Sequence, residues 1–116
     1  MENLDQIRAA AALAPAATLK RGAISKLPGL IINNGLLAAA AFAEADGGGD
    51  NKVHLKNAMV AVARHLSKRG IIGPNITGTM AMIEDLSQRR SSLDLQRATS
   101  EALAFLSYLK RFAPAE

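Results

Sequence analysis

The chain contains no cysteine and no tryptophan among its 116 residues. The absence of cysteine excludes disulfide bonds and thiolate metal sites, and it fits a reducing compartment, so we expect a cytoplasmic protein. Long hydrophobic runs are also absent, since the longest apolar stretch, Leu36 to Ala43, is far shorter than the roughly 20 residues that span a bilayer. The opening sequence MENLDQIR is acidic and then amphipathic, unlike a secretory signal. These features predict a soluble protein that makes no membrane contact.

Aromatic residues are scarce, with three phenylalanines and one tyrosine. Proteins that bind single-stranded nucleic acids commonly stack bases on exposed aromatic rings. Three of the four aromatic residues lie near the C-terminus, on one predicted helix, where we expect them to pack in the core. A nucleic-acid partner would therefore be held mainly through its phosphates. The four residues are Phe42, Phe105, Tyr108 and Phe112.

Acidic residues are fewer than basic ones, 10 against 14, which gives a formal net charge of +4. A basic balance on a small domain suits a polyanionic partner such as nucleic acid. The clearest basic group recurs at multiples of four on a predicted helix over residues 51–69, away from its apolar face and with few acids nearby. This stripe comprises Lys52, Lys56, Arg64 and Lys68. Two further groups are Lys20, Arg21 and Lys26, and Arg97, Lys110 and Arg111.

Apolar residues recur at helical spacing along most of the chain and predict an all-α fold. We expect a single domain over residues 1–116, a compact bundle of five to six helices with short loops. The first helix covers residues 2–14, after which Pro15 either ends it or opens a new turn. Residues 16–26 then continue as helix. The predicted apolar face of the first helix is Leu4, Ile7, Ala11 and Ala14.

A second helix is predicted to start at Ser25-Lys26-Leu27-Pro28, with the proline in its first turn, and to run to Ala45. Within it, Asn34-Gly35 between apolar residues is also a signal for a β-hairpin. The alanine run at 38–41 favours helix, and an isolated hairpin is barely stable. We therefore predict helix, with Gly35 allowing another helix to approach closely.

The glycine-rich stretch at 46–50 is predicted to be a loop. No strand precedes it and no Gly-Lys-Ser/Thr follows it, so it is no phosphate cradle. Asp50 is the expected N-cap of the helix at 51–69, and Gly70 is its left-handed C-terminal cap. The predicted apolar face of this helix is Leu55, Met59, Val62 and Leu66.

Two more helices complete the prediction. Asn75 caps a helix that runs to about Gln88, with Ile76, Met80, Ile83 and Leu86 or Ser87 facing inward. Ser91 or Ser92, aided by Asp94, caps a last helix over 95–113. Its apolar face is Leu95, Thr99, Ala102, Leu106, Leu109 and Ala113, and its outer side carries Arg97, Glu101, Lys110 and Arg111.

Residue types that carry catalysis are present without a convergent arrangement. His54 and His65 lie about 16 Å apart along one helix, so they cannot share a metal, and we expect both on the helix surface. Glu84 and Asp85 diverge around a helix, and surface pairs with Gln88 and Arg89 are the favoured interpretation. No serine has a visible histidine–carboxylate partnership. We therefore predict that the protein is not an enzyme and binds no metal or cofactor.

Three stretches resemble the small subunit of the type III-B CRISPR effector, the Cmr complex, which is the fifth Cmr subunit family. They are LDQIRAAAAL at 4–13, LPGLIINNGLLAAAAF at 27–42 and RATSEALAFLSYLKRFA at 97–113. Pro15 departs from the family pattern, in which continuous helix is expected. The resemblance implies an all-helical, non-catalytic subunit that stacks head to tail beside the other Cmr subunits and helps to hold the guide–target RNA duplex.

From the resemblance and the basic groups together, we expect contacts to the guide and target RNA backbone. The residues predicted to make them are Lys20, Arg21, Lys26, Lys56, Arg64 and Lys68. Head-to-tail stacking would need two different complementary patches, for instance Asp5 or Glu84 against arginines. The alternative is a helical protein–protein adaptor with no direct nucleic-acid contact. A small hydrolase is a third, much weaker hypothesis.

Overall fold

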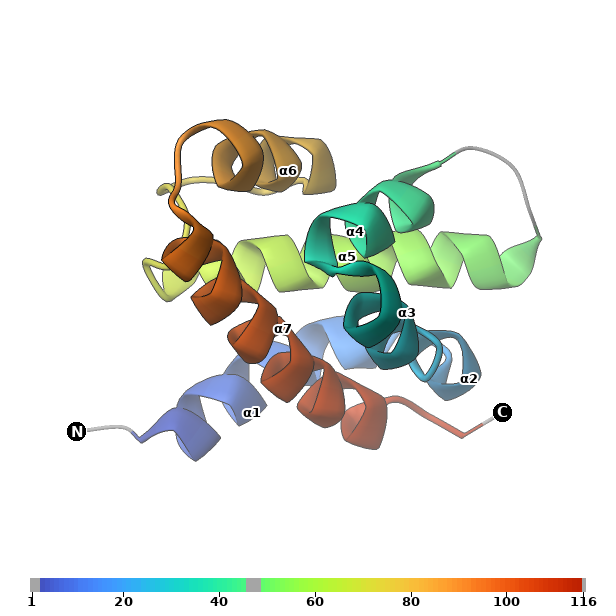
Figure 1. The fold of residues 1–116 in the computed structure, drawn as a ribbon. Helices are drawn as coiled ribbons and strands as arrows, with labels where there is room; N and C mark the ends of the chain where they lie inside the picture. The colour runs from blue at the N-terminus through green and yellow to red at the C-terminus, as the bar shows by residue number, and fades with distance from the viewer. Residues whose placement is uncertain (1–2, 46–48, 116) are drawn as a thin grey trace.

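The computed structural model describes residues 3–45 and 49–115, and within them it contains helices and no strand (Figure 1). This confirms the predicted all-α class. The number of helical segments exceeds the predicted five to six because one expected helix is divided and a four-residue turn forms separately. The segments are α1 (Leu4–Ala16), α2 (Arg21–Ile24), α3 (Leu27–Asn34), α4 (Leu36–Glu44), α5 (Asp50–Lys68), α6 (Thr79–Gln88) and α7 (Ser92–Phe112).

The two longest helices, α5 and α7, supply much of the core. Helix α7 crosses in front of α5 and α1 in Figure 1, and it packs against α1. The predicted apolar face of α5 is confirmed, because Leu55, Met59, Val62 and Leu66 are all buried. The predicted face of α7 is confirmed in its C-terminal half, where Ala102, Leu106, Leu109 and Ala113 are buried. No helix in the described ranges is long and apolar enough to cross a bilayer.

The predicted apolar face of α1 is wrong, because the residues that α1 buries lie one or two positions after the predicted ones. Ala12 and Ala16 are fully buried, whereas Leu4 is 42% exposed and Ala14 lies on the surface. Alanine is small enough to suit either face, so the apolar pattern did not fix the orientation of this helix. Pro15 lies inside α1, one residue before its end. The chain then turns before α2, so the expected continuous helix over 16–26 is also wrong.

Gly35 divides the predicted second helix into α3 and α4. Its φ of +92° and ψ of 158° lie outside the region that other residues adopt, and the peptide chain changes direction there. A Cβ at this position would meet nothing within 4 Å, so the prediction of close helix approach is wrong. Gly35 is needed for its backbone conformation. Helix on both sides excludes the rival hairpin, and Pro28 lies in the first turn of α3 as predicted.

Helix α5 begins at Asp50 with Gly49 at the N-cap position, so Asp50 is the first helical residue and the predicted N-cap is one position out. The rest of the predicted loop, Asp46 to Gly48, lies outside the described residues. At the other end Gly70 has a φ of +72°, which confirms the left-handed cap. The amides of Gly70 and Ile71 donate to the carbonyls of Ser67 and Leu66, the pair of bonds that defines a Schellman motif.

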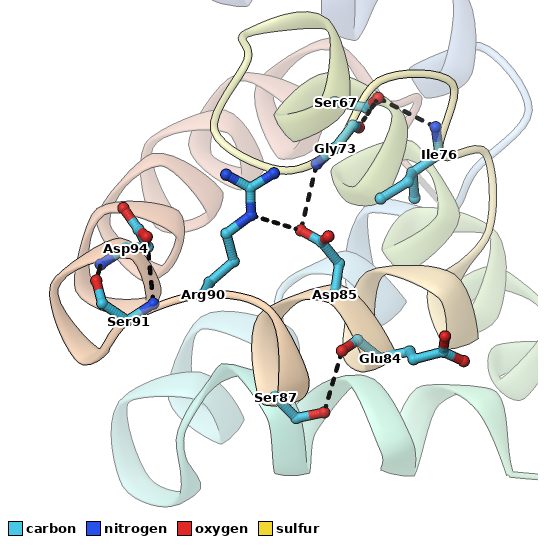
Figure 2. Close-up of polar contacts among 9 residues, drawn as sticks. All are labelled: Ser67, Gly73, Ile76, Glu84, Asp85, Ser87, Arg90, Ser91 and Asp94. Atoms are coloured by element: carbon cyan, nitrogen blue, oxygen red, sulfur yellow. Dashed lines mark hydrogen bonds and ion pairs between the residues drawn. The ribbon is translucent and has the colours of Figure 1, made fainter.

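The connection between α5 and α6 is longer than predicted. Asn75 is not an N-cap: it has a φ of +63° within the loop, and α6 begins only at Thr79. The Ser67 hydroxyl holds this loop, donating to the Gly73 carbonyl and accepting from the Ile76 amide (Figure 2). The predicted inward face of α6 is wrong at Met80, which is 58% exposed while Met82 is buried, but Leu86 is buried as predicted.

Helix α7 begins with a complete capping box. The Ser91 hydroxyl accepts from the Asp94 amide, and the Asp94 carboxylate accepts from the Ser91 amide (Figure 2). This confirms the predicted cap and makes α7 three residues longer at its start. Of the aromatic side chains on α7, Phe105 is fully buried but Phe112 is 40% exposed, so only part of the predicted aromatic core forms.

Candidate nucleic-acid interface

The basic stripe of α5 faces two different neighbours. At its N-terminal end Lys52 lies 3.7 Å above the centre of the Phe42 ring, and its Nζ donates to the Phe42 carbonyl of α4. Lys56, one turn later, has its Nζ 3.8 Å from Glu44 Oε1 and remains 46% exposed. These two lysines therefore contact α4. Because a spacing of four residues exceeds one helical turn, the later residues of the stripe, Arg64 and Lys68, point to a different side of α5.

The C-terminal half of the stripe borders a groove of about 520 Å³ between α1 and α5. Arg64 and Lys68 are both exposed there, and no acidic residue is among those that line the groove. The floor is made of small apolar side chains, among them Ala11, Ala14 and Ala61. The groove thus combines an apolar floor with a basic rim.

The Arg21 side chain donates hydrogen bonds to the C-terminus of α7. Its Nε donates to the Lys110 carbonyl at 3.2 Å, and its Nη2 donates to the carbonyls of Arg111 at 3.4 Å and Ala113 at 2.8 Å. These carbonyls have no partner within the helix, and a cation beside them also offsets the negative end of the helix dipole. Arg21 therefore lies beside Lys110 and Arg111 of the third basic group, whereas Arg97 lies near the other end of α7. Of its predicted companions, Lys20 is half-buried and Lys26 exposed.

A buried polar cluster joins three helices at Glu101. Arg8 of α1 donates from Nε and Nη2 to the two carboxylate oxygens at 2.9 and 2.8 Å. His65 Nε2 of α5 lies 2.8 Å from Glu101 Oε2, and its ring stacks on Phe105 with centroids 4.4 Å apart. The predictions of a surface His65 and an outward Glu101 are wrong, because their exposed fractions are only 3% and 6%.

The cluster shifts the acid–base equilibria of its members. Burial raises the pKa of Glu101, but the hydrogen bonds from Arg8 and His65 outweigh it and bring the pKa down from 4.5 to about 2. Burial lowers the pKa of His65 below 6.5, and the hydrogen bond that His65 donates to Glu101, which raises the pKa, offsets this only in part. At neutral pH the cluster therefore contains a carboxylate, a guanidinium and a neutral imidazole that donates from Nε2.

The predicted pairs of Glu84 and Asp85 are also wrong. Glu84 Oε1 accepts from Arg89 Nη2 at 3.2 Å on the surface. Asp85 is buried, and its Oδ2 accepts from Arg90 Nε at 3.0 Å and from the Gly73 amide at 3.2 Å (Figure 2). Both partners lie five positions along, because α6 ends at Gln88 and the chain turns back there. Asp85 thus fixes the α5–α6 loop against the start of α7.

Sequence reasoning missed the cluster because its members are far apart in the chain. Arg8 and Glu101 are 93 positions apart, and nothing in either local sequence indicates the other. A usable signal was the position of Glu101 itself, next to Ala102 and one helical turn before Phe105, at the edge of the apolar face. Within the described ranges no group of three or more histidine or acidic side chains is placed to hold a metal ion.

Comparison with known proteins identifies a family that the chain matches. Residues 4–116 match the family model described as CRISPR-associated protein (Cas_Cmr5). No curated protein and no solved structure matches the chain significantly.

Proposed function

The chain belongs to the Cas_Cmr5 family of CRISPR-associated proteins, and we propose that within the Cmr effector complex, where it associates with the other Cmr subunits, it is a non-catalytic scaffold that contacts the backbone of guide and target RNA. The proposed contacts are made by Lys20, Lys26, Lys56, Arg64 and Lys68. Arg21 acts with them by positioning the end of α7, since its Nε and Nη2 donate to carbonyls at that end.

One observation carries this proposal: the charged side chains that line the α1–α5 groove, Arg64 and Lys68, are both basic and both exposed. Lysine and arginine neutralise phosphates without reading the base sequence, which is what a protein on a guide–target duplex of changing sequence requires. The scarcity of exposed aromatic side chains agrees with binding through phosphates, because base stacking needs such rings.

The test is fluorescence anisotropy of a labelled RNA duplex at several salt concentrations. The logarithm of affinity should fall with log salt by about 0.7 to 0.9 for each phosphate contacted. Reversing Arg64 and Lys68 together to glutamate should weaken binding and make this slope shallower by about two contacts. The matched control reverses Arg89 and Lys110, which changes net charge equally on other surfaces. Equal losses in both variants would show that net charge, and not the groove, governs RNA binding.

The apolar floor of the groove favours a second candidate, a protein–protein adaptor. Alanine side chains offer contact area to an apolar side chain and nothing to a phosphate. Ala14→Trp would fill the groove from an exposed position of α1 without changing charge. Loss of incorporation into the reconstituted complex, with RNA affinity unchanged, would favour the adaptor.

We also propose that copies of the chain associate head to tail. Such a contact uses two different patches and does not close on itself. Helices α1 and α6 lie on opposite sides of α5 (Figure 1), and each exposes a large apolar side chain, Leu13 at 59% and Met80 at 58%. These two surfaces are the proposed partners.

A further inference from the structure

Three arginines from distant parts of the chain line one pocket of about 390 Å³. Arg8 comes from α1, Arg69 follows the last residue of α5, and Arg97 lies in the second turn of α7. None of them belongs to the proposed RNA surface. We infer that this arginine pocket is a binding site for a phosphate group.

The first argument is the charge that remains after internal pairing. Glu101 also lines the pocket, but both of its oxygens already accept hydrogen bonds, from Arg8 and His65. Arg8 uses two of its five N–H groups on that carboxylate, and its guanidinium also interacts with the Tyr108 side chain. Arg69 and Arg97 form no ion pair with any described residue. Three guanidinium groups against one carboxylate leave the pocket with two positive charges in excess.

The second argument is an unsatisfied donor. The Nε of Arg69 is buried and has no hydrogen-bond partner. A buried donor without an acceptor is costly, and more so when the group is charged. Arg69 lines the pocket, so an oxyanion bound there would offer acceptors to its guanidinium. The unpaired donor thus points to a missing acceptor beside Arg69.

The third argument identifies the anion. Guanidinium groups present paired N–H donors that match the oxygen spacing of phosphate, and arginine is favoured wherever planar, bidentate recognition is needed. The Ser100 hydroxyl and the Gln96 amide add neutral donors to the same pocket. Leu93, which is 66% exposed, forms an apolar side that a ribose can cover. These features fit a phosphate carried by a nucleotide unit.

The pocket is also held rigidly. The Ser91–Asp94 capping box fixes the first turn of α7, and Asp85 ties Arg90 to the loop after α5 (Figure 2). Ile71 of that loop is buried and forms part of the pocket wall. A preorganised set of donors loses less entropy on binding than a mobile one.

Nuclear magnetic resonance of the ¹⁵N-labelled full chain tests the inference directly. Inorganic phosphate is titrated at constant ionic strength against sodium chloride, and the arginine Nε–Hε signals are followed. We expect saturable shifts at Arg69 and Arg97, with little change at Arg89 and Arg111, which lie outside the pocket. Equal or unsaturable shifts at all arginines would overturn the site.

Variants then identify the source of the phosphate. Arg97→Gln, at an exposed position, should weaken phosphate binding about tenfold or more, since it removes a charged donor. Arg89→Gln makes the same charge change elsewhere and should have no effect. RNA with a 5′-hydroxyl and RNA with a 5′-phosphate are compared on both variants. A loss only for the 5′-phosphorylated RNA indicates a terminal monoester, and equal losses indicate a backbone diester.

The inference stands apart from the proposed RNA surface. If wild-type protein binds phosphate at Arg69 and Arg97 while reversal of Arg64 and Lys68 leaves RNA affinity unchanged, the pocket is retained and the groove is not. If Arg97→Gln alters neither phosphate nor RNA affinity, the pocket is rejected whatever the groove does.

Discussion

At the scale of single residues, Glu101 is a buried acid that joins three helices. Its carboxylate receives Arg8 from α1 and His65 from α5, and so joins both helices to α7. Removing one partner from a buried ion pair costs more than the pair contributes, because the other charge is left unpaired. This side chain should therefore dominate the response of the protein to both mutation and pH.

Glu101→Gln should lower the free energy of unfolding by roughly 3 kcal/mol. Each unit of pKa corresponds to about 1.4 kcal/mol, and folding lowers the pKa of Glu101 from 4.5 to about 2. Urea unfolding followed by circular dichroism measures the change. Glu84→Gln, which breaks an exposed pair, should cost no more than about 0.5 kcal/mol. Similar values for the two variants would mean that the buried cluster contributes no more than a surface pair.

The stability contribution of Glu101 should depend on pH in a defined direction. The folded state holds the pKa below its unfolded value, so the contribution is complete above about pH 4.5 and is lost as pH falls through about 2. The difference in unfolding free energy between the wild type and Glu101→Gln should therefore be constant near neutrality and shrink below pH 4.5. Burial also lowers the pKa of His65. Protonation of this side chain should therefore reduce the stability of the wild type and of the variant as pH falls below about 6.5. A difference that persists unchanged at pH 3 would contradict this account.

At the scale of secondary-structure elements, the ends of helices decide the architecture. Gly35 separates α3 from α4, the Schellman motif at Gly70 ends α5, and Arg21 binds the last carbonyls of α7. Each device satisfies backbone groups that a helix end leaves free. Two of these ends can be tested with matched variants.

Gly35→Ala should destabilise the protein by about 1–3 kcal/mol, because its backbone conformation is almost confined to glycine. Gly29→Ala is the control. It lies inside α3, and neither position has an atom within 4 Å of the added Cβ, so the two variants differ only in backbone conformation. We expect Gly29→Ala to stabilise by up to about 1 kcal/mol. Thermal unfolding measures both, and a neutral Gly35→Ala would refute the backbone explanation.

Arg21→Gln should lower stability by about 1 kcal/mol through loss of its hydrogen bonds to the C-terminus of α7. Lys26→Gln, at an exposed neighbouring position, should change stability by less than about 0.5 kcal/mol. Urea unfolding compares them. If both variants lose RNA affinity equally and neither loses stability, Arg21 acts as a direct phosphate contact instead.

At the scale of the whole molecule, the folded chain has two distinct sides. The α1–α5 groove with its basic rim lies on one side, and α6 with its exposed Met80 lies across α5 from α1 (Figure 1). Different surfaces on opposite sides suit repeated association in one direction. The arrangement suits a subunit that contacts one neighbour on each side.

Head-to-tail association predicts a specific outcome in sedimentation velocity. We expect the wild type to form concentration-dependent oligomers, whereas Leu13→Glu and Met80→Glu should each sediment as a monomer, because each variant lacks one side of the contact. Mixing the two variants should restore dimers and nothing larger, since only one intact pair of surfaces remains. Arg111→Glu serves as a control at an exposed position of α7, outside both helices. Closed dimers in the wild type that survive either substitution would argue for a two-fold contact.

The all-α class, the course of α5 and the caps at Gly70 and Ser91 were predicted correctly from the sequence. Each depends on interactions within a few residues, such as the 3.6-residue period of the apolar positions Leu55, Met59, Val62 and Leu66. The family resemblance was likewise readable, because three linear motifs carry it, and the family match over residues 4–116 confirms it.

Tertiary structure alone decided which way the ambiguous residues face. Ala12 and Ala14 are chemically identical, and only the packing of α1 against the core buries the first and leaves the second exposed. In the same way, Glu101 is polar by sequence and buried by structure, because Arg8 reaches it from 93 positions away. Local sequence sets periodicity and helix ends through short-range sterics and hydrogen bonds. The burial of charge depends on partners that only the folded chain brings within about 3 Å.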